Sequence, residues 1–531
     1  MAEVSDQPFG KLRSFFWPIH GYELKKIVPL LLMFLCVSFN YTILRDMKDA
    51  LIVTAPGSGA ETLPFLKVWC VVPFAIVFMV IYAKLSNILS KQKLFYAAIV
   101  PFLIFFALFA TVIYPLRDVL HPSQSADWLQ SHLSKGFMGF VAIYRNWTFA
   151  LFYVMAELWG SVALSLVLWG FVNEITRVTE AKRFYTLLGL GANIALLISG
   201  PIIVYFSNIK ERLPANVDAL GVTLNYLMAC VVVSGIALMF IYNWMQKNVL
   251  NDPRFYNPNE VRKKKEKPKM GMMESFKFLA KSKYLGCLAI LVICYGIAMN
   301  LIEVTWKGQL HIQYPNANDY ASFMGKFSFI TGAITIFMML FVGGNLLRKK
   351  GWTFTALLTP VMILVTGTLF FTFVIFKGNL APLVALLGST PLMLGVLFGT
   401  AQNILSKSSK YSMFDPTKEM AYIPLDQESK VKGKAAIDVV GARLGKSGGS
   451  LLQQMLIVGF GSLAAITPFV AIILFGVILA WLVAGKSLGK QFGQRSFEQD
   501  EARKAKELAE ASVTAEAVPA EAVAEEETVT S

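Results

Sequence analysis

The stretch IVPLLLMFLCVSFNYTILRDMKD, residues 27–49, decides the fold. Its first 18 residues, 27–44, carry no charge, and its last five contain four charged side chains. A helix needs about 20 residues to cross the hydrocarbon of a bilayer. The stretch therefore predicts a membrane-spanning helix that carries cations and carboxylates near one end.

The same apolar pattern recurs along the chain. Hydrophobic residues make up 55% of the 531 residues and charged residues 16%, whereas a soluble domain carries about 25% charged residues. Runs with at most one charge lie at 27–44, 68–83, 94–116, 147–172, 184–209, 219–246, 285–306, 327–347, 351–376 and 378–406. An eleventh span begins near Ala435, and the run 447–485 holds its end and all of a twelfth. The sequence therefore predicts an all-α polytopic membrane protein with twelve transmembrane helices.

Charge divides the chain into five segments. We expect a cytoplasmic N-terminus (1–26), a six-helix bundle (27–246), a basic central loop (247–283), a second six-helix bundle (284–487) and an acidic, disordered tail (488–531). Lysine and arginine gather in alternate loops, which predicts that both termini are cytoplasmic. A six-plus-six plan is typical of the major-facilitator architecture, whose substrate site lies near the midplane between the halves.

The net charge of +15 averages unlike regions, because residues 497–531 contain ten acidic and three basic residues. In a membrane protein this excess indicates cytoplasmic loops first and an anionic substrate second. Binding of nucleic acid is not expected. The five cysteines lie in apolar stretches and the four histidines are scattered, so we expect no disulfide framework, metal site or cofactor.

Four ionisable residues fall inside the predicted spans: Lys48, Glu157, Glu303 and Lys446. A charged side chain at the bilayer centre costs about 2.5–3.5 kcal/mol even on the gentlest scale. We therefore expect these side chains to face a water-filled cavity, to pair with one another, or both.

Arg45 and Lys48 are three residues apart and share a helix face. Two cations on one face suit a polyphosphate, to which arginine offers a fork and lysine a point charge. The alternative is that Asp46 and Asp49 neutralise them.

The two glutamates differ in their local partners. Glu303 and Lys307 are four residues apart and could form a pair within one helix, or Glu303 could face the cavity. No cation lies one turn from Glu157, so its partner must come from another helix, and Lys48 and Lys446 are the candidates.

Lys446 lies in GARLGKSGG, residues 441–449. A phosphate-binding P-loop needs four residues between its first glycine and Gly-Lys-Ser, and Gly441 leaves three, so an ATPase site is excluded. We expect instead that the glycines allow close helix packing and that Lys446 faces the cavity. Aromatic residues near the charges could stack on a base, namely Tyr41, Trp159, Trp169, Phe171, Tyr185 and Trp306.

Several segments together resemble the nucleotide transporter family of plastids and obligate intracellular bacteria, the non-mitochondrial ATP/ADP translocases. The matching stretches are FNYTILRDMKD (39–49), AELWG (156–160), FVNEIT (171–176), NLIEVTWK (300–307), MAYIPLDQ (420–427) and VKGKAAIDVVGARLGKSGG (431–449). The resemblance implies a monomeric carrier in the bacterial inner membrane that imports ATP in exchange for ADP, with phosphate as a further expected partner. It also implies that two lysines and two glutamates are the key charged residues. The lysines fall on Lys48 and Lys446 and the second glutamate on Glu303. For the first glutamate Glu157 is preferred to Glu174, which lies at the cytoplasmic edge of its span. The complete set of expected substrate-binding residues is Asn40, Tyr41, Arg45, Lys48, Glu157, Asn300, Glu303 and Lys446.

Two other functions remain open from the sequence. One is a proton-coupled importer of several nucleotides or of NAD, because carboxylates within a membrane also serve proton relays. The other is a membrane-embedded transferase, which would need clustered histidines, aspartates or a metal set at one interface, and the sequence offers none. We expect a carrier rather than an enzyme.

Overall fold

A computed structural model of the chain describes residues 19–252, 255, 274, 277–279, 282–386 and 388–517, and these residues form helices and connecting turns without a strand. The helices of the N-terminal half are η1 (Gly21–Glu23), α2 (Leu24–Val53), α3 (Thr62–Phe65), η2 (Leu66–Val71), α4 (Val72–Ile88), α5 (Lys91–Leu108), η3 (Phe109–Ile113), α6 (Arg117–Leu120), α7 (Ser123–His132), η4 (Lys135–Phe137), α8 (Met138–Arg145), α9 (Trp147–Trp159), η5 (Gly160–Leu168), α10 (Trp169–Ile175), α11 (Val178–Ser207), η6 (Asn208–Arg212) and α12 (Ala219–Asn248). The helices of the C-terminal half are α15 (Lys283–Gln313), α16 (Ala317–Phe337), η7 (Met338–Gly343), α17 (Gly344–Ile375), α18 (Lys377–Ala385), α19 (Pro391–Ser409), η8 (Lys410–Phe414), α20 (Asp415–Met420), α21 (Gln427–Arg443), η9 (Leu444–Gly448), α22 (Gly449–Phe460) and α23 (Leu463–Ala517).

Within the described ranges, nine helical stretches are long and apolar enough to cross a membrane. One of them, Ala317–Ile375, has 59 residues and contains both α16 and α17. Gly351, in a non-helical conformation (φ 78°), divides α17 into two helical parts. The structure is thus that of an all-helical polytopic membrane protein. The count of twelve spans stays a prediction.

Two predicted segments differ in the structure. The run 378–406, expected as one span, is divided into α18 and α19, because Gly388 adopts φ 66° and Pro391 begins a new helix. Residues 488–517 of the tail, expected to be disordered, continue α23. The alanines, glutamates and lysines after Phe497 are strong helix formers, and no glycine or proline interrupts them before Pro519. The central loop lies mostly outside the described residues.

Several helices begin at side chains that cap them. Asp218, Ser282, Asn316 and Thr390 each accept a hydrogen bond from a backbone N–H in the first turn of the helix that follows. Such caps satisfy donors that have no partner within the helix. They fix where the long apolar helices start, and thereby which charged residues fall within them.

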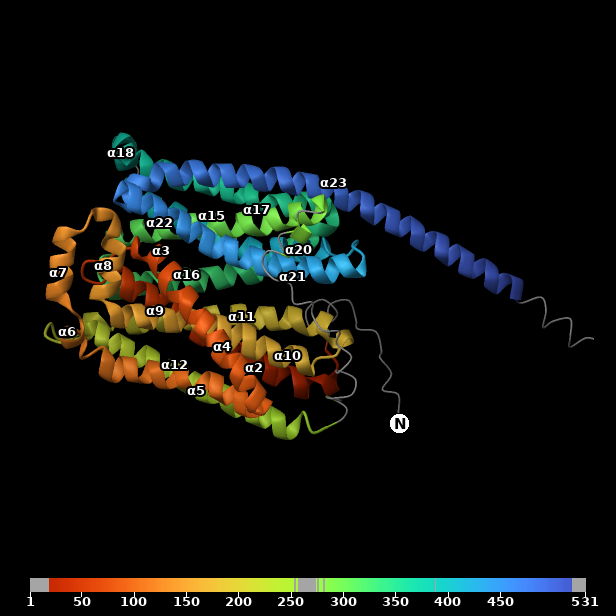
Figure 1. The fold of residues 1–531 in the computed structure, drawn as a ribbon, viewed down its shortest axis with the longest axis horizontal. Helices are drawn as coiled ribbons and strands as arrows, with labels where there is room; N and C mark the ends of the chain where they lie inside the picture. The colour runs from red at the N-terminus through yellow and green to blue at the C-terminus, as the bar shows by residue number, and fades with distance from the viewer. Residues whose placement is uncertain are drawn as a thin grey trace, which may run out of the picture.

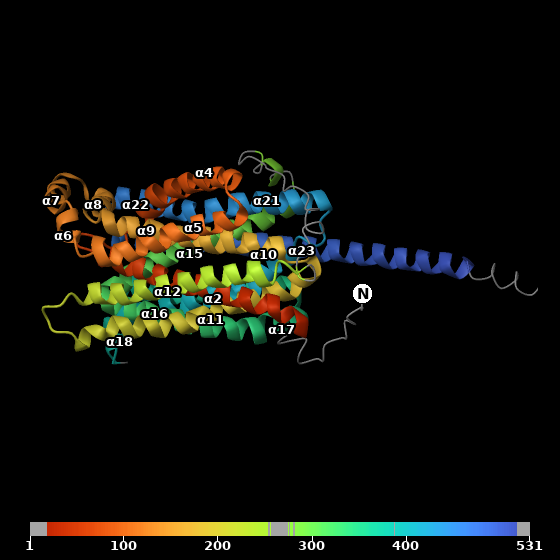
Figure 2. The ribbon, with the colours of Figure 1, turned by 90° about the horizontal axis from the view of Figure 1, so that it is seen from below.

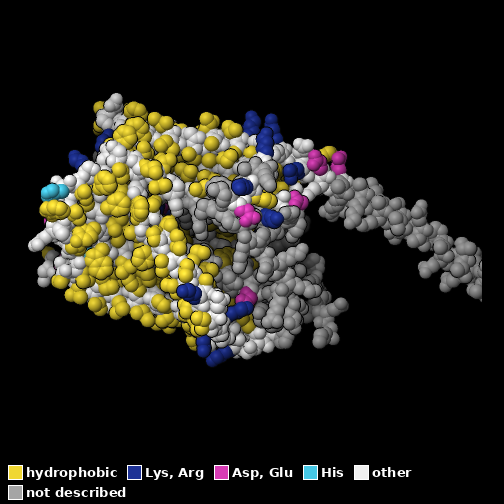
Figure 3. Space-filling model, viewed as in Figure 1, with side chains coloured by type: hydrophobic (Ala, Val, Ile, Leu, Met, Phe, Trp, Pro, Cys, Tyr) yellow, Lys and Arg dark blue, Asp and Glu magenta, His cyan; other side chains and the backbone are white. Residues whose placement is uncertain are grey.

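The helices run side by side, with the C-terminal half above the N-terminal half in Figure 1. We call the end that carries α6, α7 and α8 the α7 end, and the opposite end, where α2 begins and α23 leaves the bundle, the terminal end (Figures 1 and 2). Hydrophobic side chains cover most of the visible surface of the bundle, and basic side chains gather toward the terminal end (Figure 3). This distribution is the one that a helical bundle in a bilayer requires.

The two halves meet closely along α11 and α16. A Cβ atom on Gly200 of α11 would lie 2.6 Å from the carbonyl oxygen of Gly325 in α16, so only glycine fits there. A Cβ atom on Gly332 would similarly lie 2.8 Å from Leu196 Cβ. Small residues at such positions let membrane helices approach backbone to backbone.

Candidate site: a charge network between the halves

The first helix of each half carries charges where the halves meet. α2 contributes Lys48 and Asp49, and α15 contributes Glu303 and Lys307. Lys307 Nζ lies 2.7 Å from Asp49 Oδ2, which joins α2 to α15 through an ion pair. Lys307 also lies 3.1 Å from Glu303 Oε1, so the pair expected from the four-residue spacing is present.

Lys48 completes this chain of charges on the N-terminal side. Its Nζ lies 2.9 Å from Asp49 Oδ1 and 3.0 Å from Glu157 Oε1 of α9. The ammonium also lies 3.9 Å from the centre of the Tyr153 ring, which favours a cation on its face. The prediction that Glu157 pairs with a lysine from another helix is therefore confirmed for Lys48.

Arg45 lies one turn earlier on α2 and also reaches the C-terminal half. Its Nε pairs with Asp46 Oδ1 at 3.0 Å, and its guanidinium donates to Ser328 Oγ of α16 at 2.7 Å. Ser328 in turn donates to Asp46 Oδ2 at 2.5 Å. Asp46 and Asp49 thus pair with Arg45 and Lys48, which was the alternative considered from the sequence.

Two lysines that the sequence analysis missed belong to the same region. Lys67 of η2 donates to Asn300 Oδ1 at 3.0 Å, and Lys407 of α19 lies 3.8 Å from Glu303 Oε1. Both lie just outside the uncharged runs, 68–83 and 378–406, and so resembled residues of the membrane surface. Nothing in the sequence marks Lys67; only the structure places it in a π-helical segment, and such segments are frequent at functional sites.

The network has a closed part and a partly accessible part. Lys48 and Lys307 have side chains that are 2% and 3% exposed, whereas Glu157 and Glu303 are 28% and 24% exposed. Lys407 is accessible to a similar degree. A polar solute that reaches this level of the bundle would therefore meet the glutamates and Lys407 before the closed lysines.

The remaining predicted residues are placed differently. Asn40 is buried and donates to the carbonyl oxygen of Val231 in α12, so its amide faces the interior of the N-terminal half. The Tyr41 ring lies 5.9 Å from the Arg45 guanidinium. The side chain of Lys446 lies outside the described residues; its backbone is in η9, where Gly445 packs against α15.

Polar contacts between the halves continue toward the α7 end. Lys210, in η6, lies 2.5 Å from Asp319 at the start of α16. Trp69 Nε1 donates to Gln454 Oε1 of α22 at 3.2 Å. Together with the Arg45–Ser328 and Asp49–Lys307 contacts, these two contacts join the halves from the charge network toward the α7 end. Polar contacts thus hold the two halves together at the α7 end.

The site gathers charged side chains of both signs. It offers five cations (Arg45, Lys48, Lys67, Lys307 and Lys407) and four carboxylates (Asp46, Asp49, Glu157 and Glu303). No cluster of three or more metal-ligating side chains occurs in the ranges that the structure describes. These cations and carboxylates could contact a charged ligand.

Comparisons with known proteins identify the family of this chain. Residues 2–492 match the model of the family described as "TLC ATP/ADP transporter". The chain is 62% identical over 516 residues to "ADP,ATP carrier protein 1" of Chlamydia muridarum, which covers 97% of both chains. It is 54% identical over 485 residues to "ADP,ATP carrier protein 2, chloroplastic" of Arabidopsis thaliana, covering 91% of this chain and 77% of that protein.

Solved structures show the fold. A bacterial homologue of the iron transporter ferroportin, crystallised in an inward-facing state, is similar with a TM-score of 0.54 at 14% identity and covers 89% of this chain and 100% of that one. At this identity the likeness shows the fold alone, the major-facilitator-like arrangement that the six-plus-six plan predicted. With a family match over almost its whole length, the chain belongs to the TLC ATP/ADP transporter family.

Proposed function

We propose that the protein is an ATP/ADP antiporter that imports ATP in exchange for ADP. The observation that carries this proposal is the ion pair between Asp49 and Lys307, which places a network of five cations where the two halves of the bundle meet. Relatives over nearly the full chain are named ADP,ATP carriers. A polyphosphate is the anion whose charge matches so many converging cations.

The carboxylates give the empty site its own counter-ions. Glu157 pairs with Lys48, and Glu303 pairs with Lys307 and Lys407. An arriving triphosphate would displace these two glutamates, because they are more accessible than Lys48 and Lys307. The lysines then exchange one set of anionic partners for another. They are never left unpaired within the membrane, where an unpaired charge is costly.

Alternating access would follow from rocking of the two halves around this site. The polar contacts at the α7 end, such as Lys210–Asp319, would have to break when that end opens. We further propose that Lys446, which belongs to η9 beside α15, faces the same site and contacts the phosphates. We propose that the protein is a monomer in the bacterial inner membrane and that both termini are cytoplasmic. The α7 end would then lie on the outer side of that membrane, and the polar contacts there would hold the outer side closed.

Counterflow tests the function directly. Proteoliposomes loaded with ADP should take up labelled ATP far faster than empty vesicles. Loading with UTP, CTP, GTP or NAD instead of ADP measures the selectivity for the base. A Glu303→Gln protein, reconstituted to the same density, serves as the inactive control. Uptake that is equal in empty vesicles would refute exchange.

Two further measurements separate the alternatives. Uptake that collapses with a protonophore and needs no internal nucleotide would favour the proton-coupled importer, in which Glu157 and Glu303 carry the protons. Release of labelled phosphate from the vesicles together with ADP would establish phosphate as a co-substrate.

A further inference from the structure

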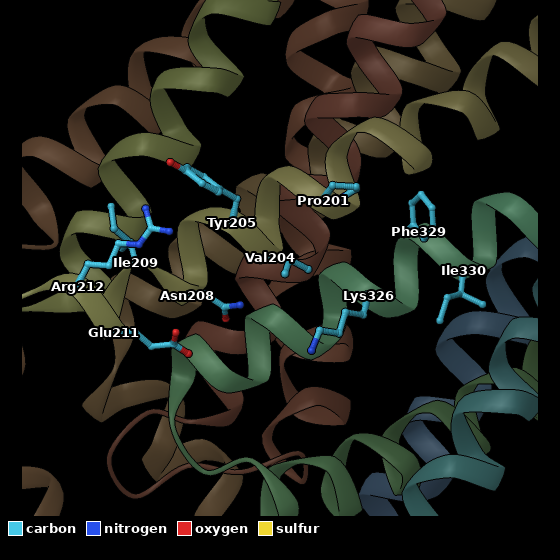
Figure 4. A pocket seen from close by; sticks show the side chains of 10 residues that line it. All are labelled: Pro201, Val204, Tyr205, Asn208, Ile209, Glu211, Arg212, Lys326, Phe329 and Ile330. Atoms are coloured by element: carbon cyan, nitrogen blue, oxygen red, sulfur yellow. The ribbon is translucent and has the colours of Figure 1, made fainter.

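A second candidate site lies on the outside of the bundle, where the two halves meet. α11 and η6 form one wall of a groove of about 720 Å³, and α16 forms the other (Figure 4). Pro201 and Lys326 in its lining are the sequence neighbours of Gly200 and Gly325, whose backbones touch. The groove therefore follows the line along which the halves meet.

The lining of the groove is mainly apolar and is exposed at the surface of the bundle. Tyr205, Phe329 and Ile330 contribute large exposed side chains. All three belong to stretches that are long and apolar enough to span the membrane. The ligand suited to these walls is one with hydrocarbon chains.

One cation in this apolar setting lacks a partner. Lys326 is nine residues from the start of α16, about 13 Å along the helix, and its side chain is exposed. In the part of the chain that the structure describes, Lys326 forms no ion pair. In Figure 4 its side chain extends along α16 toward the end where Glu211 lies, away from Phe329 and Ile330. A lysine so placed extends its ammonium toward the headgroup level.

The polar end of the groove carries a net positive charge. Arg212, at the end of η6, is the second cation of the lining, and Glu211 is its one carboxylate. No ion pair joins Glu211 to either cation in the described ranges. Two cations against one acid favour an anionic headgroup over a zwitterionic one.

We propose that this groove binds one anionic phospholipid. Its phosphate contacts Lys326 and Arg212, and an acyl chain lies along Tyr205, Phe329 and Ile330. A free phosphate or nucleotide would leave the apolar walls uncovered, whereas a lipid satisfies both parts of the groove. Since each half supplies one wall, the bound lipid stabilises the arrangement in which α11 and α16 are in contact.

The test measures lipid binding on the full chain and does not depend on transport. The purified protein is reconstituted in nanodiscs of phosphatidylcholine with or without phosphatidylglycerol, and retained lipids are counted by native mass spectrometry after transfer to detergent. The wild type should retain one phosphatidylglycerol and unfold several degrees higher in its presence. Lys326→Gln should lose at least 10-fold in phosphatidylglycerol retention, and Lys326→Gln combined with Arg212→Gln should lose the thermal shift.

A matched control is Lys377→Gln, which removes another exposed lysine, in α18 at the same end of the molecule. This variant should retain phosphatidylglycerol as the wild type does. Unchanged retention by Lys326→Gln would overturn the proposal. So would equal retention of phosphatidylcholine or phosphatidylethanolamine, and so would an equal thermal shift with inorganic phosphate alone in lipid-free detergent.

Discussion

The first helices of the two halves, α2 and α15, both bring an acid and a base to the level where the halves meet, but they use them differently. On α2, Lys48 and Asp49 are neighbours and both are closed off from solvent. On α15, Glu303 is partly accessible while Lys307 is closed. The closed members, Lys48, Asp49 and Lys307, form a chain that fastens one half to the other.

The difference separates two tasks within one network. The closed members hold the halves in register, and their loss should be felt first in stability. The open members, Glu157, Glu303 and Lys407, are those that a substrate can reach, and their loss should be felt first in transport. Three predictions test this separation.

The largest effect on stability should come from Asp49→Asn. This change leaves Lys48 and Lys307 without their shared partner, and removal of one member of a buried ion pair costs about 3–5 kcal/mol. Thermal unfolding in detergent should show a much lower midpoint. Adding Lys307→Gln to Asp49→Asn should recover part of the loss, because the buried cation is removed as well. A double variant as unstable as the sum of two single variants would contradict the fastening role.

Glu303→Gln should have the opposite profile. Asp49 still pairs with Lys307 in this variant, so the unfolding midpoint should change little. ATP/ADP exchange should fall by about 100-fold, equivalent to about 2.7 kcal/mol, because Lys407 and Lys307 lose the counter-ion that a phosphate displaces. Exchange in proteoliposomes measures this loss, and Glu303→Asp should restore part of it. Normal exchange by Glu303→Gln would remove this carboxylate from the transport cycle.

A smaller effect is expected for Lys407→Gln. The ammonium lies at the edge of the network, 3.8 Å from Glu303, so its loss should raise the KM for ATP by about 10-fold, or 1.4 kcal/mol. Lys407→Arg should recover most of the affinity, since it keeps the charge. Lys410→Gln is the matched control: Lys410 lies one turn further on and pairs with Asp415 instead. An equal change in both glutamine variants would point to a general effect on the helix.

How much of this site the sequence predicts depends on whether a contact is local. The Glu303–Lys307 pair follows from spacing along one helix, and the pairing of Glu157 with a distant lysine follows from the absence of a cation nearby. The Asp49–Lys307 pair could not be predicted, because it depends on how α2 and α15 are rotated toward each other. Lys67 and Lys407 were missed for a related reason. Hydropathy locates the ends of apolar runs, but not how deep a helix end lies in the bundle.

The same limit applies to the fold. Runs of apolar residues predicted the membrane-spanning character that the structure shows, because burying a backbone in lipid requires helices. They did not predict the division of 378–406, since Gly388 and Pro391 are themselves uncharged and do not interrupt a hydropathy pattern. The acidic charge and the lack of aromatic residues after Phe497 suggested a disordered tail, whereas the helix propensity of alanine, glutamate and lysine favours the continuation of α23.

This continuation gives α23 a long helical segment outside the bundle. α23 is one helix of 55 residues, about 80 Å long, and its outer part projects well beyond the bundle (Figures 1 and 2). A small tilt of its inner part would be amplified into a large displacement of the tip. The position of a fluorophore attached near Ala517 would therefore report tilting of the C-terminal half, and it could be measured in solution beyond the membrane.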